Sequence, residues 1–521
     1  MAREAWKTKI GLILAMAGNA VGLGNFLRFP VQAVQNGGGA FMIPYFVAFL
    51  LLGIPLMWIE WGMGRFGGKH GYGTVPRIFD RLWNHPAAKY VGVLGLFIPL
   101  ALLCYYMYIC SWTLGYSVFS VIGQYDGILT RESMGSFLAG YQGVEVNQYF
   151  HHLWPAFFFF MVTLVLTTYT LSHGLVSGIE RLAKVAMPAL FIFGVILVVR
   201  IFMIGAPDPA VPEQNIVNGL AFIWNPNFSE LKNSSVWLAA AGQVFFTLSL
   251  GFGAIQTYAS YVPKNDDVAL TGLTTAMTNE FAEVILGSSI AIPVAVAFFG
   301  LTETMSIAHG GAFDLGFQSM PIIFQRIPWG SFFGCMWFLL LFFAGITSCV
   351  AMAQPIMALL KEEFGLSTQK AAYSIGAFLL IATLPVMFFI QYGFLDELDF
   401  WIGTFGLVVF AVIEVVLFVW VFGSYRCWKE ITRGSYVQIP QFFFLIIRYV
   451  TPFYLIVLLF AWMHEYGIDI ILMRGVEEVN RPYVLGARLM LTAIFVLLCV
   501  LIHFGFKKRK KRIFHIQKGK I

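Results

Sequence analysis

The feature that most constrains this chain is a series of long apolar segments that recur along almost its whole length. A helix needs about 20 largely apolar residues to cross the hydrocarbon core of a bilayer. Twelve segments meet that length, near residues 9–34, 40–64, 90–121, 153–171, 185–204, 235–262, 270–300, 331–360, 371–390, 400–423, 441–463 and 484–506. Only 12% of the residues are charged, about half the share of a soluble protein. We therefore predict an all-α membrane protein with twelve transmembrane helices.

The distribution of positive charge predicts the orientation of these helices. An even number of spans puts both termini on one side, and 24 of the 33 Lys and Arg residues then lie on that side against 6 on the other. Because positive charge is retained in cytoplasmic loops, we expect a multi-pass protein of the cell (inner) membrane with both termini cytoplasmic. The basic run 507–512 follows the last span, in a tail over 507–521, and does not indicate a nucleic-acid partner. The longest outside loops, 122–152, 205–234 and 301–330, should hold short helices that cap the outer face.

Two spans carry glycines and polar side chains at mid-membrane depth: Ala15–Pro30, AMAGNAVGLGNFLRFP, and Thr247–Gly253, TLSLGFG. A helical glycine costs about 1 kcal/mol relative to alanine, and each unpaired backbone group in hydrocarbon costs several times as much. Close packing of helices is the alternative reason for such glycines. However, the two interruptions open corresponding five-span units, about 6–204 and 235–423, and paired interruptions point to the central site of a transporter. Since five is odd, the second unit is inverted. Helices 11 and 12, about 441–506, lie outside the repeat, and the whole chain, 1–521, forms one transmembrane domain.

A helix broken in the membrane offers two kinds of binding group. Freed carbonyl oxygens suit a small hard cation, and the N–H groups at the new helix start suit a carboxylate. Carboxylates inside spans are functional candidates by default. For Glu283 we favour a functional role, whereas for Glu60 and Glu414 we favour a structural brace.

Several other sequence patterns match enzyme or nucleotide-binding motifs in part, but they do not predict an enzyme or an ATP-driven pump. The G-x-G-x-x-G match at 62–67 ends a predicted transmembrane helix instead of joining a strand to a helix. An H-x4-D match at 309–314 and the pair His151-His152 lie in outside loops without companion motifs. There is no P-loop, so ATP-driven transport is not expected. A channel and a membrane enzyme are less well supported than a secondary transporter, and a non-transporting amino-acid sensor on the same fold stays open.

Four motifs carry a resemblance to a known family. GNAVGLGNFLRFP (18–30), NGGGAF (Asn36–Phe41), FFTLSLGFG (Phe245–Gly253) and ASYV (Ala259–Val262) resemble the neurotransmitter:sodium symporter family, and most of all its bacterial leucine-transporter-type amino-acid transporters. The resemblance implies a five-plus-five inverted repeat with helices 1 and 6 broken at mid-membrane. It also implies sodium-coupled uptake of an amino acid by alternating access. The expected partners are a small-molecule amino acid, sodium ions and membrane lipid, and a homodimer is left open.

The resemblance also implies two Na⁺ sites and a substrate pocket. The first Na⁺ site would use the substrate carboxylate with Ala20, Asn25, Thr247 and Asn279, and the second would use Gly18, Val21, Ala344, Thr347 and Ser348. The carboxylate of the substrate would meet the N–H groups of Leu23 and Gly24 and the hydroxyl of Tyr106. The rest of the pocket would be formed by Ala20, Gly22, Leu102, Phe246, Thr247, Ser249, Phe252, Ser348 and Met352.

Three departures and matches refine this expectation. The pocket wall is mostly apolar, and Gly22 stands where monoamine-transporting relatives carry an aspartate, so a neutral, largely apolar amino acid is predicted. Glu283 would supply the charge that chloride provides in chloride-dependent relatives, so transport should be chloride-independent, with proton exchange at Glu283 left open. The outer gate would be an Arg28–Asp399 ion pair, and the inner gate would join Arg3 and Trp6 to Glu362.

Overall fold

The structure, a computed structural model, describes residues 4–518, most of which lie in helices. The side chains of 465, 466 and 510–518 are outside that description. Ten stretches are long and apolar enough to cross a membrane. Three of them each contain two helices: Gly39–Lys69 (α4, Gly39–Ala48, and α5, Ile54–Lys69), Val268–His309 (α15, Val268–Glu280, and α16, Ser288–His309) and Phe394–Val421 (α20, Phe394–Asp399, and α21, Leu407–Val415). Two are single helices, Trp154–Ser172 (α10) and Gly330–Phe364 (α18). The other five are Ala88–Ile122 (mostly α8, Leu94–Ile122), Leu175–Phe202 (ending in α11, Arg181–Phe202), Thr368–Tyr392 (mostly α19, Thr368–Phe389), Phe442–Trp462 (ending in α24, Thr451–Trp462) and Arg481–Arg509 (within α26, Arg481–Lys518).

The two remaining predicted spans are the ones that break. The first consists of α1 (Lys9–Ala20), α2 (Leu23–Phe26) and α3 (Arg28–Gln35), and the sixth consists of α13 (Ser234–Thr247) and α14 (Ala254–Ala259). The ten continuous stretches and these two interrupted ones account for the twelve predicted spans. The division of the chain into repeat units at the stated boundaries stays a prediction.

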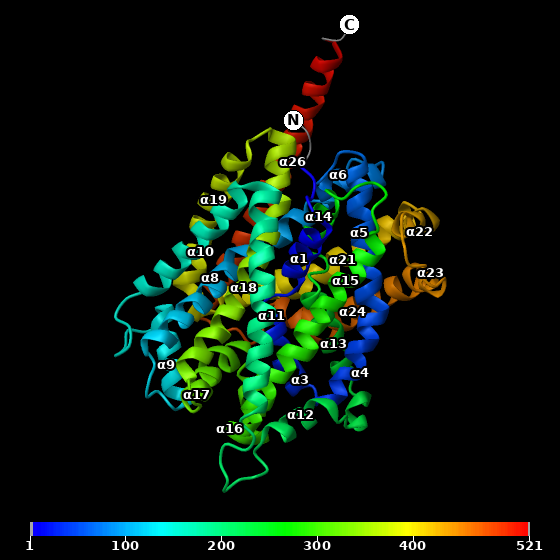
Figure 1. Ribbon diagram of the computed structural model, residues 1–521. Helices are drawn as coiled ribbons and strands as arrows, with labels where there is room; N and C mark the ends of the chain where they lie inside the picture. Colours follow the sequence, from blue (N-terminus) through cyan, green and yellow to red (C-terminus); the bar gives the residue numbers. More distant parts are fainter. Residues whose placement is uncertain (1–3, 519–521) are drawn as a thin grey trace.

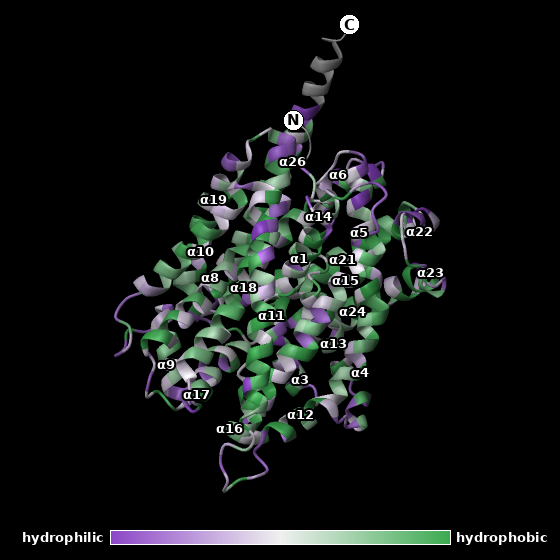
Figure 2. Ribbon diagram, viewed as in Figure 1, coloured by the Kyte–Doolittle hydropathy of each residue, from purple (hydrophilic) through white to green (hydrophobic). Residues whose placement is uncertain are grey.

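The described chain ends lie at the same end of the molecule, as an even number of spans requires (Figure 1). Apolar residues cover the middle of the helix bundle and polar residues gather at its two ends (Figure 2). The central stretches Ala88–Ile122 and Gly330–Phe364 are largely buried, and α8 packs along α18. Only 28–39% of the stretches of α10, α19, α24 and α26 is buried, which indicates that these helices lie at the lipid-facing side of the bundle.

The fifth span begins at Leu175, whereas the apolar pattern predicts 185. Its first two turns contain Glu180, Arg181 and Lys184, which lower the local hydropathy. Glu180 is nevertheless 1% exposed, because it accepts hydrogen bonds from the Thr8 hydroxyl at 2.7 Å and from Lys184 at 2.7 Å. Because this charged side chain is paired and buried, the hydropathy of the sequence alone does not identify this part of the helix as part of the span.

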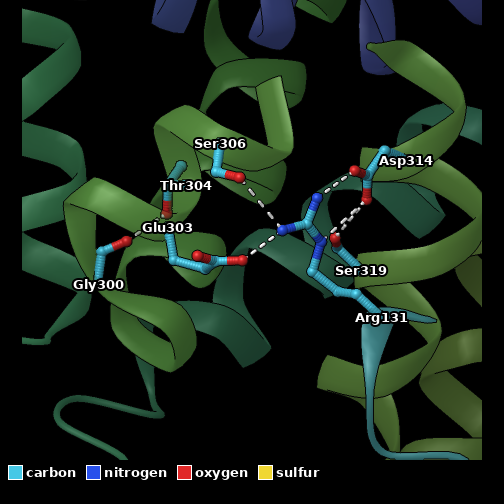
Figure 3. Close-up of polar contacts among 7 residues, drawn as sticks. All are labelled: Arg131, Gly300, Glu303, Thr304, Ser306, Asp314 and Ser319. Carbon is cyan, nitrogen blue, oxygen red and sulfur yellow. Dashed lines mark hydrogen bonds and ion pairs between the residues drawn. The ribbon is translucent and has the colours of Figure 1, made fainter. Parts of the chain in front are cut away.

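Short helices occupy the three long loops that the charge pattern predicts to be outside: α9 (Arg131–Gln142), α12 (Ile216–Trp224) and α17 (Met320–Gln325). The backbone of Gly300 (φ 78°, ψ 167°) separates the last turns of α16, 301–309, from the span itself. Arg131 joins both arms of this outer loop, because it binds Glu303 and Ser306 on one arm and Asp314 on the other (Figure 3). The tip between the arms, Gly310–Phe313, is therefore held in place over the outer vestibule.

The break of the sixth span requires glycine, as Gly251 shows. Gly251 has φ +74°, and a Cβ there would lie 2.6 Å from the Leu407 carbonyl oxygen. Gly393 has the matching φ of +75° with nothing within 4 Å of its Cβ position.

We predict that Gly251→Ala lowers the apparent melting temperature of the purified protein more than Gly393→Ala. Both substitutions place a side chain on a left-handed backbone, which costs about 1–2 kcal/mol. Only Gly251→Ala adds a steric clash with a backbone carbonyl. Thermal unfolding in detergent measures both variants side by side. Equal shifts would show that α21 does not constrain the break.

Candidate functional site

The two interrupted helices are bonded to each other at their breaks. The Ser249 hydroxyl, on a residue with φ +53°, donates to the Asn19 carbonyl oxygen at 2.8 Å. Behind the sixth-span break, Glu60 accepts a hydrogen bond from the Gly251 N–H at 2.8 Å. Two of the backbone groups freed by the breaks, the Asn19 carbonyl and the Gly251 N–H, are thus satisfied, as the membrane interior demands.

Glu60 and Glu414 lie in one cluster behind the broken helix. Both side chains are 0% exposed, and Gln256 of α14 donates to Glu414. Glu60 holds the backbone just before α14, and Glu414 holds α14 itself. The contacts of these carboxylates with the broken helix agree with the structural role favoured from the sequence.

A cavity lies between the breaks and is lined by both of them. The lining includes all but one of the residues predicted to contact the substrate: Ala20, Gly22, Gly24, Leu102, Tyr106, Phe246, Thr247, Ser249, Phe252, Ser348 and Met352. The remaining residue, Leu23, donates its N–H to the Tyr106 hydroxyl at 3.0 Å. A Cβ on Gly22 would lie 2.9 Å from the same hydroxyl, so Gly22 leaves open the space beside it.

Oxygen atoms converge at the inner edge of this cavity. The Asn25 side-chain amide donates to the Thr247 hydroxyl at 3.1 Å, and its nitrogen lies 2.8 Å from a terminal atom of the Asn279 side-chain amide. One terminal atom of the Asn279 amide lies 3.1 Å from the carbonyl oxygens of both Ala20 and Thr247. If that atom is the nitrogen, it donates to both carbonyls. If it is the oxygen, three oxygens face one another, an arrangement that a cation stabilises.

Glu283 adjoins this oxygen cluster directly. Its two carboxyl oxygens accept hydrogen bonds from Asn25 at 3.0 Å and from Gln243 at 2.8 Å, and the side chain is fully buried. The neighbouring Glu280 accepts from the Tyr45 hydroxyl at 3.0 Å.

A second group of oxygens lies between α1 and α18. The Ser348 hydroxyl is 3.3 Å from the Gly18 carbonyl oxygen and 3.1 Å from the Ala344 carbonyl oxygen. The Thr347 hydroxyl is 3.1 Å from the same Ala344 oxygen. Val21 follows α1 with extended backbone (ψ 104°), so the helix ends beside this group. Hydroxyl and carbonyl oxygens from two helices thus meet at one point.

The predicted outer gate residues share a vestibule of about 390 Å³. No ion pair joins Arg28 to Asp399 among the described residues. Arg28 instead lies over the Phe246 ring at 4.5 Å, and Asp399 accepts from the Tyr105 hydroxyl at 2.6 Å. The two charges therefore face the vestibule with a tyrosine and a phenylalanine as their contacts.

On the opposite side, Trp6 donates to the Tyr258 carbonyl oxygen of α14 at 3.2 Å, and their rings meet edge to face. Glu362 accepts from the Gly73 N–H at 3.0 Å. The predicted partner Arg3 lies outside the described residues. The amino-terminal segment is thus held against the inner half of the sixth span.

Sequence reasoning missed three residues at this site: Gln243, Tyr45 and Tyr105. Gln243 precedes Thr247 by four residues, so both face the same side of α13. That spacing was the available signal for Gln243. Tyr45 and Tyr105 lie in aromatic-rich spans, where a hydroxyl with a functional partner leaves no pattern in the sequence.

Comparisons with known proteins find similarity over most of the chain. The model of the sodium:neurotransmitter symporter family matches residues 3–126 and 144–508. An uncharacterized sodium-dependent transporter of Methanocaldococcus jannaschii is 29% identical over 96% of this chain and 98% of its own length. A mouse sodium- and chloride-dependent neutral and basic amino acid transporter, B(0+), is 24% identical over 82% of this chain and 74% of its own. The crystal structure of MhsT in complex with L-phenylalanine has a TM-score of 0.75 and 27% identity, and covers 88% of this chain and 100% of that one.

We predict that Gln243→Leu destabilises the protein by about 1–3 kcal/mol, the cost of leaving a buried acceptor without its donor. The apparent melting temperature in detergent measures the loss. In a Glu283→Gln background the same substitution should cost less, because the carboxylate is gone. An identical cost in both backgrounds would mean that Gln243 acts on something other than Glu283.

Proposed function

Because this chain belongs to the sodium:neurotransmitter symporter family, a family of secondary transporters and not of enzymes, we propose that it takes up a neutral, largely apolar amino acid with two sodium ions by alternating access. The observation that carries the proposal is the cavity between the two breaks, where backbone donors, clustered oxygens and an apolar wall adjoin one another. Two relatives support an amino acid as the substrate: B(0+) is named as an amino-acid transporter, and MhsT was crystallised with L-phenylalanine.

Each part of the cavity suits one part of such a substrate. The N–H groups of Leu23 and Gly24 open the short helix α2, and the Tyr106 hydroxyl lies beside them. These groups would bind the carboxylate. Leu102, Phe252 and Met352 form an apolar wall for the side chain. Gly22 brings no carboxylate of its own, so the substrate must supply the negative charge that meets the first sodium ion.

The two oxygen clusters would hold the sodium ions. In the first, Ala20, Asn25, Thr247 and Asn279 would be joined by the substrate carboxylate, so that ion and substrate bind together. In the second, Gly18, Val21, Ala344, Thr347 and Ser348 would bind an ion between α1 and α18. An ion there links the broken first helix to a continuous one, which couples sodium binding to the movement of α1.

The gates follow from the two ends of this pathway. We propose that Arg28 and Asp399 move into contact when the outer vestibule closes above Tyr106 and Phe246. Trp6 and Glu362, with Arg3, would separate when the inner side opens. Both termini would be cytoplasmic, in the orientation that the positive charges favour.

Uptake by the full chain in proteoliposomes tests the proposal. An inward sodium gradient should drive accumulation of a radiolabelled neutral amino acid, and a potassium gradient should not. Asn279→Leu should abolish uptake. Thr278→Val should retain it, because among the described residues the Thr278 hydroxyl bonds only the Thr274 carbonyl oxygen of its own helix. Sodium-dependent binding with no accumulation would support a sensor instead.

Membership of the family does not decide whether transport needs chloride, since B(0+) is named as chloride-dependent. Chloride independence therefore has its own test. We predict that replacing chloride with gluconate leaves the uptake rate unchanged, because Glu283 already places a negative charge beside the first cluster. Glu283→Gln should then slow uptake in gluconate by more than about tenfold, since unit charges about 4 Å apart interact by about 4 kcal/mol. A large loss of wild-type rate in gluconate would contradict the prediction.

A further inference from the structure

A basic pocket of about 420 Å³ lies away from the central cavity. The helices that bound it, α6 (Val75–Leu82) and the late part of α26, lie at the end of the molecule where both described chain ends are found (Figure 1). The pocket is bounded by the chain between α6 and α8 and by the end of α26. The side chains used below are Asn84, His85, Lys89, His503, Phe506 and Lys507. Its volume is many times the ~30 Å³ that a water molecule occupies in the liquid.

The pocket has an excess of positive charge. No ion pair involves Lys89 or Lys507 within the part of the chain that the structure describes. Lys89 instead lies 4.9 Å from the Tyr90 ring and 5.4 Å from the Phe506 ring. Asp80 is the one acidic residue of the lining. Two ammonium groups without a carboxylate partner therefore stand at the mouth of one pocket.

The wall behind these lysines is tightly bonded. Arg77 forms two hydrogen bonds to Glu363, at 2.7 and 2.6 Å, and Arg509 binds the same carboxylate at 3.3 Å. The Arg77 guanidinium also stacks on the Phe506 ring at 3.4 Å. Glu363 is thus shared by two arginines, so the wall adds positive charge to the pocket and holds α6, α18 and α26 together.

The pocket lies at the depth of lipid headgroups. Lys89 is the second residue of the stretch Ala88–Ile122, and Lys507 lies near the end of Arg481–Arg509, so two spans reach the same membrane surface there. Next to the pocket, Val500 and Phe504 of α26 are 44% and 58% exposed. They are four residues apart and form one apolar face. A charged pocket beside an apolar helix face fits an amphiphile better than a free anion.

We propose that this pocket binds the phosphate headgroup of an anionic membrane phospholipid. Lys89 and Lys507 supply the charge, Asn84 and His85 offer hydrogen-bond donors, and an acyl chain lies along Val500 and Phe504. Basic pockets between transmembrane helices bind anionic headgroups in this way. Because Glu363 adjoins Glu362, a bound lipid would brace the end of α18 next to the predicted inner gate.

Native mass spectrometry of the full chain, with added phosphatidylglycerol or phosphatidylcholine, tests the proposal. The wild type should retain phosphatidylglycerol preferentially. A Lys89→Ala/Lys507→Ala variant should retain it about tenfold less, because each lysine near anionic lipid contributes to binding. Lys370→Ala/Lys429→Ala removes two exposed lysines elsewhere and should behave like the wild type. An equal loss in both variants, or no preference between the lipids, would overturn the proposal.

Two further measurements distinguish lipid binding from a folding defect and from the binding of free phosphate. Lys89→Arg/Lys507→Arg should restore retention, and all variants should melt at the wild-type temperature in phosphatidylcholine. Phosphatidylglycerol should raise the wild-type melting temperature, whereas inorganic phosphate should not. A phosphate-induced shift that depends on Lys89 and Lys507 would assign the pocket to a free anion and contradict the lipid assignment.

Discussion

Two helices that stop halfway through the membrane leave backbone groups that hydrocarbon cannot solvate, and the rest of the structure depends on how these groups are satisfied. The hydroxyl of Ser249 joins the second break to the first, and the carboxyl of Glu60 caps the second break from behind. Polar side chains from α8, α15 and α18 complete the site. The same backbone groups that would destabilise an isolated helix become the walls of a cavity.

The hydrogen-bond donors that contact each buried carboxylate depend on where that carboxylate lies. Glu60 and Glu414 bond to the sixth-span break and to α14, and they hold the broken helix in shape. Glu283 bonds instead to Asn25 and Gln243 and adjoins the first oxygen cluster. Burial alone does not distinguish these carboxylates, since all three are 0% exposed. Their hydrogen-bond partners distinguish them, because among these three only Glu283 has a partner in a predicted ion site.

The sequence predicts the fold well because membrane spans and helix breaks leave local signals. Apolar length reveals the spans, and the glycines around Asn19 and Gly251 reveal the breaks. The fifth span shows the limit, because Glu180 is buried against Lys7 and Thr8, residues far away in the chain. Tyr45 and Tyr105 were missed for the same reason. The Arg28–Asp399 ion pair that the resemblance implied is not formed among the described residues, because the residues alone do not specify how far apart the helices hold the two charges.

The central claim is that the two breaks bind a sodium ion and a zwitterion as one unit. Equilibrium binding of a radiolabelled neutral amino acid to the purified protein tests it most directly, at equal ionic strength in sodium or potassium chloride. A shared site predicts saturable binding in sodium and an affinity at least about tenfold weaker in potassium, whose larger ion does not fit oxygens spaced for sodium. Equal affinity in the two salts would contradict the claim.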